Sequence, residues 1–168
     1  MDAQEYAKDF LEGVRSEAAA TGEGKCAVFV RNVAQQLVDA EVLPDFEGSF
    51  YTGTGRGNRK FRVDGYILDE FDMAMNLIIA DFDEDPDRIL AKTGISQCLT
   101  RLSYFAELAL NGSLHDVIEP STPCADLADI IHTYKDRIRK FKYHIFTDAS
   151  VSATIKTVET QPIGTIPT

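Results

Sequence analysis

The chain has 168 residues, of which 44% are hydrophobic and 26% are charged, and its formal net charge is −10. This composition excludes a disordered chain and predicts one globular domain or slightly more. No apolar run approaches the length of about 18 residues that spans a membrane. The charged N-terminus lacks the apolar core of a secretion signal, so we expect a cytoplasmic protein with no membrane anchor.

Two helices are predicted at the start of the chain. Residues 3–20 carry apolar side chains at intervals of four positions, which is typical of an amphipathic helix, and residues 25–41 carry a second such stripe. We expect residues 1–45 to form a helical segment that packs on a core made by residues 46–168.

A glycine-rich stretch, TGTGRGNRK, lies within residues 46–60. Its glycine spacing superficially suggests a phosphate-binding loop. The dinucleotide fingerprint, however, needs a strand before it and a helix after it. Here a strand follows, which favours a mobile glycine-rich loop whose arginines could still contact phosphates. A short strand near residues 47–52 is expected before it.

An antiparallel hairpin is predicted from strands over residues 61–68 and 74–82, separated by the polar turn DEFD. Alternation in the first strand assigns its side chains to two faces. One face takes Phe61, Val63 and Ile67, and the other takes Arg62, Asp64, Tyr66 and Leu68.

The C-terminal half contains helices predicted over residues 92–111 and 123–137, a strand over 140–148 and a short helix over 150–157. Strands followed by helices and one more strand predict a mixed α+β fold, with helices packed on a central mixed sheet. The three cysteines, Cys26, Cys98 and Cys124, form no CxxC or Cys/His cluster. This spacing argues against zinc and favours reduced thiols buried in helices.

The charges are sorted along the chain. Residues 56–62 carry four bases and no acid, residues 64–87 carry nine acids and no base, and residues 135–142 carry five bases and one acid. The net charge argues against a nucleic-acid binder, whereas the two basic segments could follow a phosphate backbone. No Ser or Cys stands in a suggestive pattern with a histidine, so a hydrolytic triad has no support.

Asp64 and Asp81 are the candidate site residues that the hairpin brings together. A turn near residues 71–72 pairs residue 64 near residue 79, which places the two carboxylates diagonally on one face, at roughly 7–8 Å between backbones. With no base among residues 64–87, their repulsion requires a proton or a cation. Mg²⁺ accepts one or two carboxylates and could activate water toward a phosphodiester. A plain acidic surface turn explains the same residues without a site.

Four segments together resemble the N-terminal region of AIPR (abortive infection phage resistance) proteins. These segments are FRVDGYILDE, LIIADF, ILAKTGISQCLTRLSYFAELALNGSL and FTDASVS, and the resemblance is best over residues 46–150. It implies a PD-(D/E)xK, restriction-endonuclease-like core, which runs helix, three strands, helix, strand. It also implies that the chain is a fragment of a longer phage-defence protein, whose remaining domain is a partner.

The resemblance assigns roles to three positions of the hairpin. Asp64 resembles the first metal-binding aspartate of the motif, Asp81 falls at its (D/E) position, and Asp83 stands where the lysine is expected. The lysine orients water and stabilises negative charge, which an aspartate does not. Either a basic residue of the next helix replaces it, with Lys92 first and Arg101 second, or the metal acts alone at low activity, or cleavage is lost.

The sequence therefore predicts a domain that binds or cleaves nucleic acid with Mg²⁺, held by Asp64 and Asp81, with Lys92 as the substitute base. Asp39 and Glu41, near the end of the second helix, could add a carboxylate. A non-catalytic protein-interaction or scaffolding module is the alternative, and homo-oligomer formation is left open. The expected nucleic-acid contacts are Arg56, Arg59, Lys60 and Arg62.

Overall fold

The computed structural model describes residues 2–151, apart from the side chains of Arg56 and Val151. The chain forms α-helices, a main sheet, a short second sheet and two single-turn 3₁₀ helices, which are labelled η. In order they are α1 Ala3–Thr21, α2 Lys25–Asp39, β1 Glu47–Thr54, η1 Arg56–Asn58, β2 Lys60–Asp69, β3 Ala74–Asp81, β4 Ile89–Leu90, α3 Lys92–Leu110, η2 Ser113–Asp116, α4 Pro123–Thr133, β5 Lys140–Thr147 and β6 Ser150–Val151.

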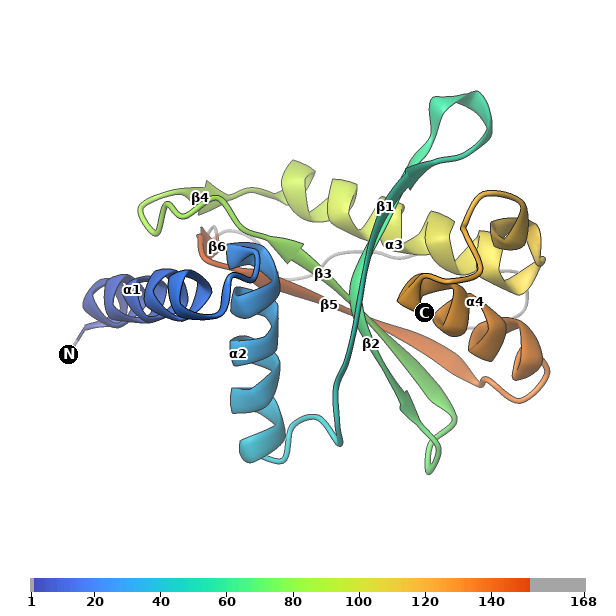
Figure 1. Cartoon of the computed structure of the whole chain (residues 1–168), viewed down its shortest axis with the longest axis horizontal. Coiled ribbons are helices and arrows are strands. Elements are labelled where there is room, and N and C mark those ends of the chain that lie inside the picture. Colours follow the sequence, from blue (N-terminus) through green and yellow to red (C-terminus); the bar gives the residue numbers. More distant parts are fainter. Residues whose placement is uncertain (1, 152–168) are drawn as a thin grey trace.

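The main sheet has four strands in the order β1-β2-β3-β5 (Figure 1). β1, β2 and β3 are antiparallel neighbours, and β5 joins the edge of β3 in parallel after the crossover through α3 and α4. β4 and β6 pair in parallel as a separate small sheet beyond the ends of β3 and β5. This architecture confirms the predicted mixed α+β class, with a mixed sheet flanked by helices.

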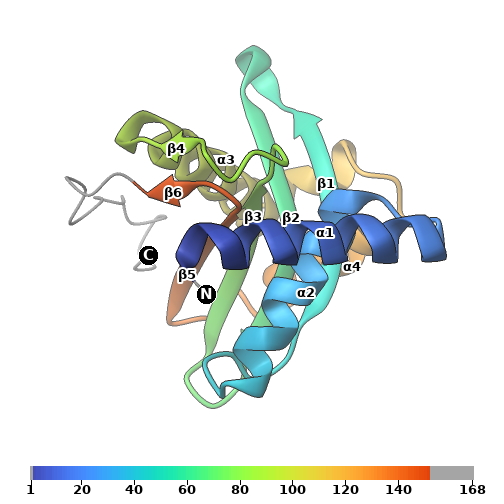
Figure 2. The ribbon, with the colours of Figure 1, turned by 90° about the vertical axis from the view of Figure 1, so that its left-hand side faces the viewer.

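Helices cover both faces of the sheet, so the molecule has three layers (Figure 2). On one face, α1 and α2 bury apolar side chains against Ile78, Ala80 and Phe146 of the sheet. On the other face, α3 and α4 enclose a larger core with Leu77 and Phe141. β3 is buried on both faces, which explains why residues 77–80 form an uninterrupted apolar run.

The predicted hairpin register is confirmed, because Gly65 pairs with Ile78 and Asp69 with Ala74. The predicted faces of β2 are wrong in part. Val63 packs in the α3/α4 core and Ile67 in the α1/α2 core, so the strict alternation breaks between them. The cause is local: the β1 register shifts opposite this segment, and the described β2–β3 pairing stops at Gly65.

The glycine-rich stretch is divided between strand and loop, which corrects in part the expectation of a loop there. β1 continues to Thr54, and only residues 55–59 form the tip of the projecting hairpin (Figure 1). Gly53 is needed for close packing, since a Cβ there would lie 2.5 Å from the Phe61 ring.

At the C-terminal end, Ser150 and Val151 form strand β6, which corrects the helix predicted over 150–157, and the rest of that prediction lies outside the described residues. The three cysteines are free. Cys98 and Cys124 are buried in helices as predicted, whereas Cys26 is only partly buried. Within residues 2–151 no helix has the length and apolar character needed to span a bilayer.

Candidate functional site

Asp64 lies where β2 separates from β3, and its side chain is 4% exposed. Its Oδ2 accepts a hydrogen bond of 2.7 Å from the backbone N–H of Ala80. The carboxylate therefore takes the place of a backbone partner at the point where the ladder ends. The same carboxylate pairs with the Arg62 guanidinium, with Nε 3.0 Å from Oδ2 and Nη2 3.2 Å from Oδ1.

Arg62 is held between β2 and α2. Its Nη2 also lies 3.5 Å from the Cys26 Sγ. Burial alone would lower the pKa of the Arg62 guanidinium, but the charge and hydrogen bonds of Asp64 outweigh it and raise that pKa. Burial, followed by the charge of Asp64, raises the pKa of the Cys26 thiol, so this cysteine is not an activated nucleophile.

Asp81 ends β3, directly opposite Thr147 of β5. The Thr147 hydroxyl donates a hydrogen bond of 2.7 Å to Oδ2 of Asp81. The same oxygen lies 2.8 Å from Nη1 of Arg88. The parallel pairing of β3 with β5 thus delivers a hydroxyl to the Asp81 carboxylate from a residue far away in sequence.

Arg88 connects three carboxylates. Besides Asp81, its Nη2 lies 2.9 Å from Oδ1 of Asp148, and its Nε lies 3.4 Å from Oδ2 of Asp83. The Asp148 side chain is only 2% exposed, and it accepts the backbone N–H groups of Asp83 and Asp85. Asp148 therefore fixes the loop that follows β3.

These two arginines correct the expectation that the carboxylates lack basic partners. The counter-charges come from Arg62 and Arg88, which lie immediately outside the acidic stretch of residues 64–87. Arg88, Thr147 and Asp148 were missed at the sequence level. The available signals were weak: Arg88 is the first base after the acidic stretch, and Asp148 belongs to the FTDASVS segment that carried the family resemblance.

Asp64 and Asp81 act on a common neighbour, the buried Cys98 thiol of α3. Burial raises the pKa of this thiol, and the charges of Asp81 and Asp64 raise it further. Arg101, one turn along α3, lowers it. The two carboxylates lie at the same end of the sheet, because Asp64 accepts the backbone N–H of Ala80, the residue before Asp81.

Arg101 and Lys92 occupy different environments on α3. Lys92 is exposed at the first residue of the helix and forms no hydrogen bond or ion pair with the residues that the structure describes. Arg101 is half-buried and close enough to Cys98 to affect its thiol. Asp83, at the expected lysine position, has a side chain that is 68% exposed.

Asp39 and Glu41 lie at the wrong end of α2 to join these carboxylates. Lys25, the first residue of that helix, pairs with Glu84 next to the site at 3.2 Å. The 15-residue helix then runs away from the site for about 22 Å before it reaches Asp39.

The N-terminal helices hold the loop after β3 through Glu84. The Glu84 carboxylate lies 3.1 Å from Nε of Arg15 in α1, in addition to its contact with Lys25 in α2. Hydrogen bonds from these two bases lower the pKa of Glu84. Glu84 has a backbone φ of 59°, a strained value for a non-glycine residue that the surrounding contacts maintain.

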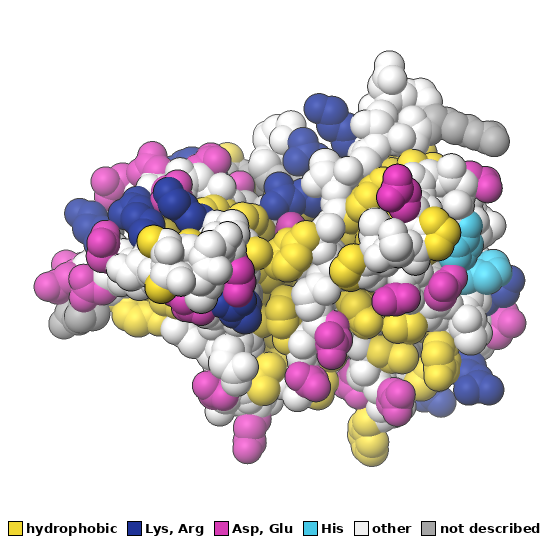
Figure 3. All heavy atoms as spheres, in the orientation of Figure 1, with side chains coloured by type: hydrophobic (Ala, Val, Ile, Leu, Met, Phe, Trp, Pro, Cys, Tyr) yellow, Lys and Arg dark blue, Asp and Glu magenta, His cyan; other side chains and the backbone are white. Residues whose placement is uncertain are grey.

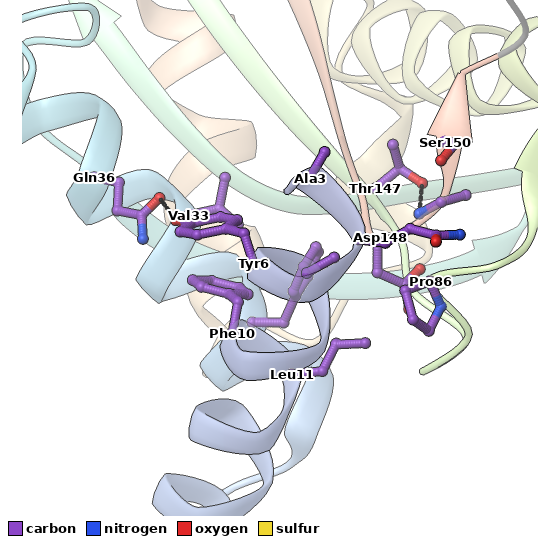
Figure 4. A pocket seen from close by; sticks show the side chains of 14 residues that line it. Ala3, Tyr6, Phe10, Leu11, Val33, Gln36, Pro86, Thr147, Asp148 and Ser150 are labelled. Atoms are coloured by element: carbon purple, nitrogen blue, oxygen red, sulfur yellow. Dashed lines mark hydrogen bonds between the residues drawn. The ribbon is translucent and has the colours of Figure 1, made fainter. Parts of the chain in front are cut away.

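A cavity of about 300 Å³ adjoins this loop between α1, α2 and the β5–β6 turn (Figure 4). Its walls are mainly apolar, including Phe10 and Val33, and Tyr6 hydrogen-bonds Gln36 at one side. Asp148 forms part of the opposite wall with its charge turned to Arg88.

The basic segment 56–62 divides between the hairpin tip and the site. Arg59 stacks its guanidinium 3.9 Å from the centre of the Tyr104 ring, beside a cavity of about 580 Å³. Lys60 is exposed, whereas the guanidinium of Arg62 faces Asp64. The Arg56 side chain lies outside the described part of the chain. Lys and Arg side chains gather beside the projecting hairpin on the face shown in Figure 3.

The donor chemistry of Asp64 and Asp81 suits Mg²⁺, which prefers carboxylate oxygens and retains waters. Each carboxylate, however, already contacts a guanidinium. Among residues 2–151, no three His, Cys, Asp or Glu side chains lie together as a ready-made metal site. A cation at this end of the sheet would therefore rely on these two carboxylates and water, and it would compete with arginine.

The sequence profile described as the abortive infection phage resistance protein N-terminal domain matches residues 29–168. Helix α1 and the first four residues of α2 precede the matched region. No curated protein and no solved structure matches the chain. Since the match covers most of the chain, this protein belongs to the family of abortive infection phage resistance protein N-terminal domains.

Proposed function

We propose that this domain serves abortive-infection phage defence by binding nucleic acid beside Asp64 and Asp81, with a divalent cation and phosphodiester cleavage at those carboxylates. The observation that carries the proposal is the placement of both carboxylates at one end of the sheet. Asp64 accepts the N–H of Ala80, the residue before Asp81, and it is buried where the β2–β3 ladder ends. Burial of a charge is expensive, which suggests a purpose beyond solubility.

The proposed roles follow from the contacts. Asp64 and Asp81 would hold Mg²⁺, which when bound supplies Lewis acidity to a phosphodiester. The order α2, β1, β2, β3, α3, β5 agrees with the restriction-endonuclease-like core that the family resemblance implies. Arg101 is better placed than Lys92 to supply positive charge at the reacting phosphate, because only Arg101 is partly buried near the Cys98 thiol.

The hairpin would contact the nucleic-acid backbone with Arg59 and Lys60. An exposed lysine and a guanidinium stacked on an aromatic ring are both suited to phosphate or base contacts. Lys60 begins β2, the strand that also carries Arg62 and Asp64. A single strand of nucleic acid bound along β2 would therefore lead toward Asp64 and Asp81.

Metal binding tests the site directly. Calorimetry with Mn²⁺ should show binding to the wild type and its loss in Asp81→Asn and Asp64→Asn. The asparagine variants remove charge but keep an acceptor for Thr147 and for the Ala80 N–H. No binding to the wild type at millimolar Mn²⁺ would overturn the metal-dependent function.

Nucleic-acid binding is tested separately with Lys60→Ala, and Lys8→Ala on α1 serves as a control that removes the same charge. Binding to single- and double-stranded DNA and RNA should weaken in Lys60→Ala alone. The slope of log K against log salt should fall by roughly 0.7–0.9 for one lost phosphate contact. Equal effects of the two changes would argue against a specific surface.

A non-catalytic interaction module is the second candidate, and the two ion pairs favour it. A carboxylate neutralised by Arg62 or Arg88 is a complete structural unit and needs no cation. If the domain is such a module, cells that carry the Asp64→Asn or the Asp81→Asn variant should retain phage defence. Loss of defence in both variants, with normal protein levels, would instead favour a functional site.

A further inference from the structure

Arg88 occupies one side of the Asp81 carboxylate, where a cation could also bind. Its Nη1 lies 2.8 Å from the Asp81 oxygen that also accepts the Thr147 hydroxyl. The guanidinium is a monovalent cation with the directional N–H groups that a carboxylate prefers. It thus supplies the neutralisation that a divalent cation would otherwise provide.

Arg88 is not fully satisfied in this position. Its Nε is buried and donates no hydrogen bond, since the contact with Asp83 at 3.4 Å is an ion pair without hydrogen-bond geometry. An unpaired buried donor is unfavourable. A position of the guanidinium in which Nε donates a hydrogen bond would therefore be favoured.

Asp83 and Asp148 supply that position. Asp148 is buried and anchored by two backbone N–H groups, so it stays in place when Arg88 moves. Asp83 is largely exposed, and its Oδ2 already lies 3.4 Å from Nε. A small shift of the guanidinium away from Asp81 would keep the Asp148 contact and improve the Asp83 contact.

We propose that Arg88 is an internal counter-ion that guards Asp81, and that a divalent cation binds only when Arg88 shifts from Asp81 onto Asp83. This inference rests on the proposed metal-dependent function and adds the residue that controls it. It also gives Asp83 a role at the position where the family motif has lysine: Asp83 receives the guanidinium that leaves Asp81.

The test measures Mn²⁺ binding by calorimetry in the wild type, Arg88→Lys and Arg15→Gln. Lysine keeps the positive charge but cannot span three carboxylates, so its effect separates the geometry of the guanidinium from charge alone. Arg15 pairs with Glu84 in the same loop and not with Asp81, which makes Arg15→Gln the matched control. Thermal unfolding of each variant checks that it is folded.

We expect Arg88→Lys to bind Mn²⁺ roughly five- to tenfold more tightly than the wild type. Arg15→Gln should stay within about twofold of the wild-type affinity, because its partner Glu84 is not part of the site. Adding Asp81→Asn to Arg88→Lys should abolish the gain, which would place the cation at Asp81.

An unchanged or weaker affinity in Arg88→Lys, or an equal gain in Arg15→Gln, would overturn the guarding role while leaving the metal-dependent function standing. The absence of binding in every variant would overturn both. Should Arg88→Lys fail to fold, the Arg88→Gln and Asp148→Asn double variant replaces it, since that pair of changes removes both partners of the buried ion pair.

Discussion

Asp64 of β2 accepts the backbone N–H of Ala80 in β3 at 2.7 Å, at the position where the two strands stop pairing. A side chain thus completes the sheet in place of a backbone carbonyl. The same carboxylate neutralises Arg62, so one residue supports both the ladder and a partly buried charge.

Replacing Asp64 should separate these two roles. Asp64→Ala leaves the Ala80 N–H without its acceptor and Arg62 without its counter-charge, and it should cost about 3 kcal/mol of unfolding free energy. Asp64→Asn keeps an acceptor and should cost about half as much. Urea denaturation measures both. Equal losses would show that Asp64 supports the fold through its charge alone.

The main elements were predictable because their apolar periodicity is strong. The hairpin register was predictable as well, since the turn near Asp72 fixes which residues pair. The face of the sheet on which Ile67 lies was not predictable. The break in alternation depends on the register shift of β1 and on the end of the β2–β3 pairing at Gly65.

The candidate site was predictable only in its carboxylates. Asp64 and Asp81 lie on neighbouring strands of one hairpin, so their placement at the same end of the sheet follows from local pairing. Arg88 and Asp148 are 60 residues apart, and they meet only because β5 adds in parallel to β3 and carries Asp148 past its end. This contact could not be predicted from the sequence alone, because local patterns do not show which distant strands pair.

Gly13 offers a stabilising substitution. It lies in the middle of α1 on the exposed side, and a Cβ there would meet nothing within 4 Å. Gly13→Ala should raise the unfolding free energy by about 0.5–1 kcal/mol, because alanine loses less backbone entropy than glycine. Thermal or urea unfolding measures the gain.

Gly22, which ends the same helix, is the control for this change. It has a φ of 75°, in the left-handed region that favours glycine. Gly22→Ala should therefore destabilise the protein by about 1 kcal/mol, although it also meets no neighbour within 4 Å. A gain in both variants would mean that local helix propensity outweighs the conformation of the cap.

Gly55 should be intolerant of any side chain. Its Cβ would lie 2.1 Å from Oη of Tyr104, whose ring packs edge-on against Phe61 and carries Arg59 on its face. Gly55→Ala should displace this ring and cost about 1–3 kcal/mol. Gly57→Asn, at a left-handed position with open space, should be nearly neutral. Denaturant unfolding of the two variants gives the comparison, and similar losses would contradict it.

His144 should make the stability fall in mild acid. Its Nε2 lies 2.8 Å from Oδ1 of the buried Asn76, and burial, followed by the charge of Lys142, lowers its pKa from the ordinary 6.5. Between the two pKa values the unfolded chain binds more protons than the native state, so stability is complete above about pH 6.5 and declines as the pH falls below it. His144→Gln should flatten the stability profile between pH 7 and 5, and Lys142→Gln should make it shallower. The measurement is urea denaturation across that range, and a wild-type slope unchanged in His144→Gln would exclude His144 as its source.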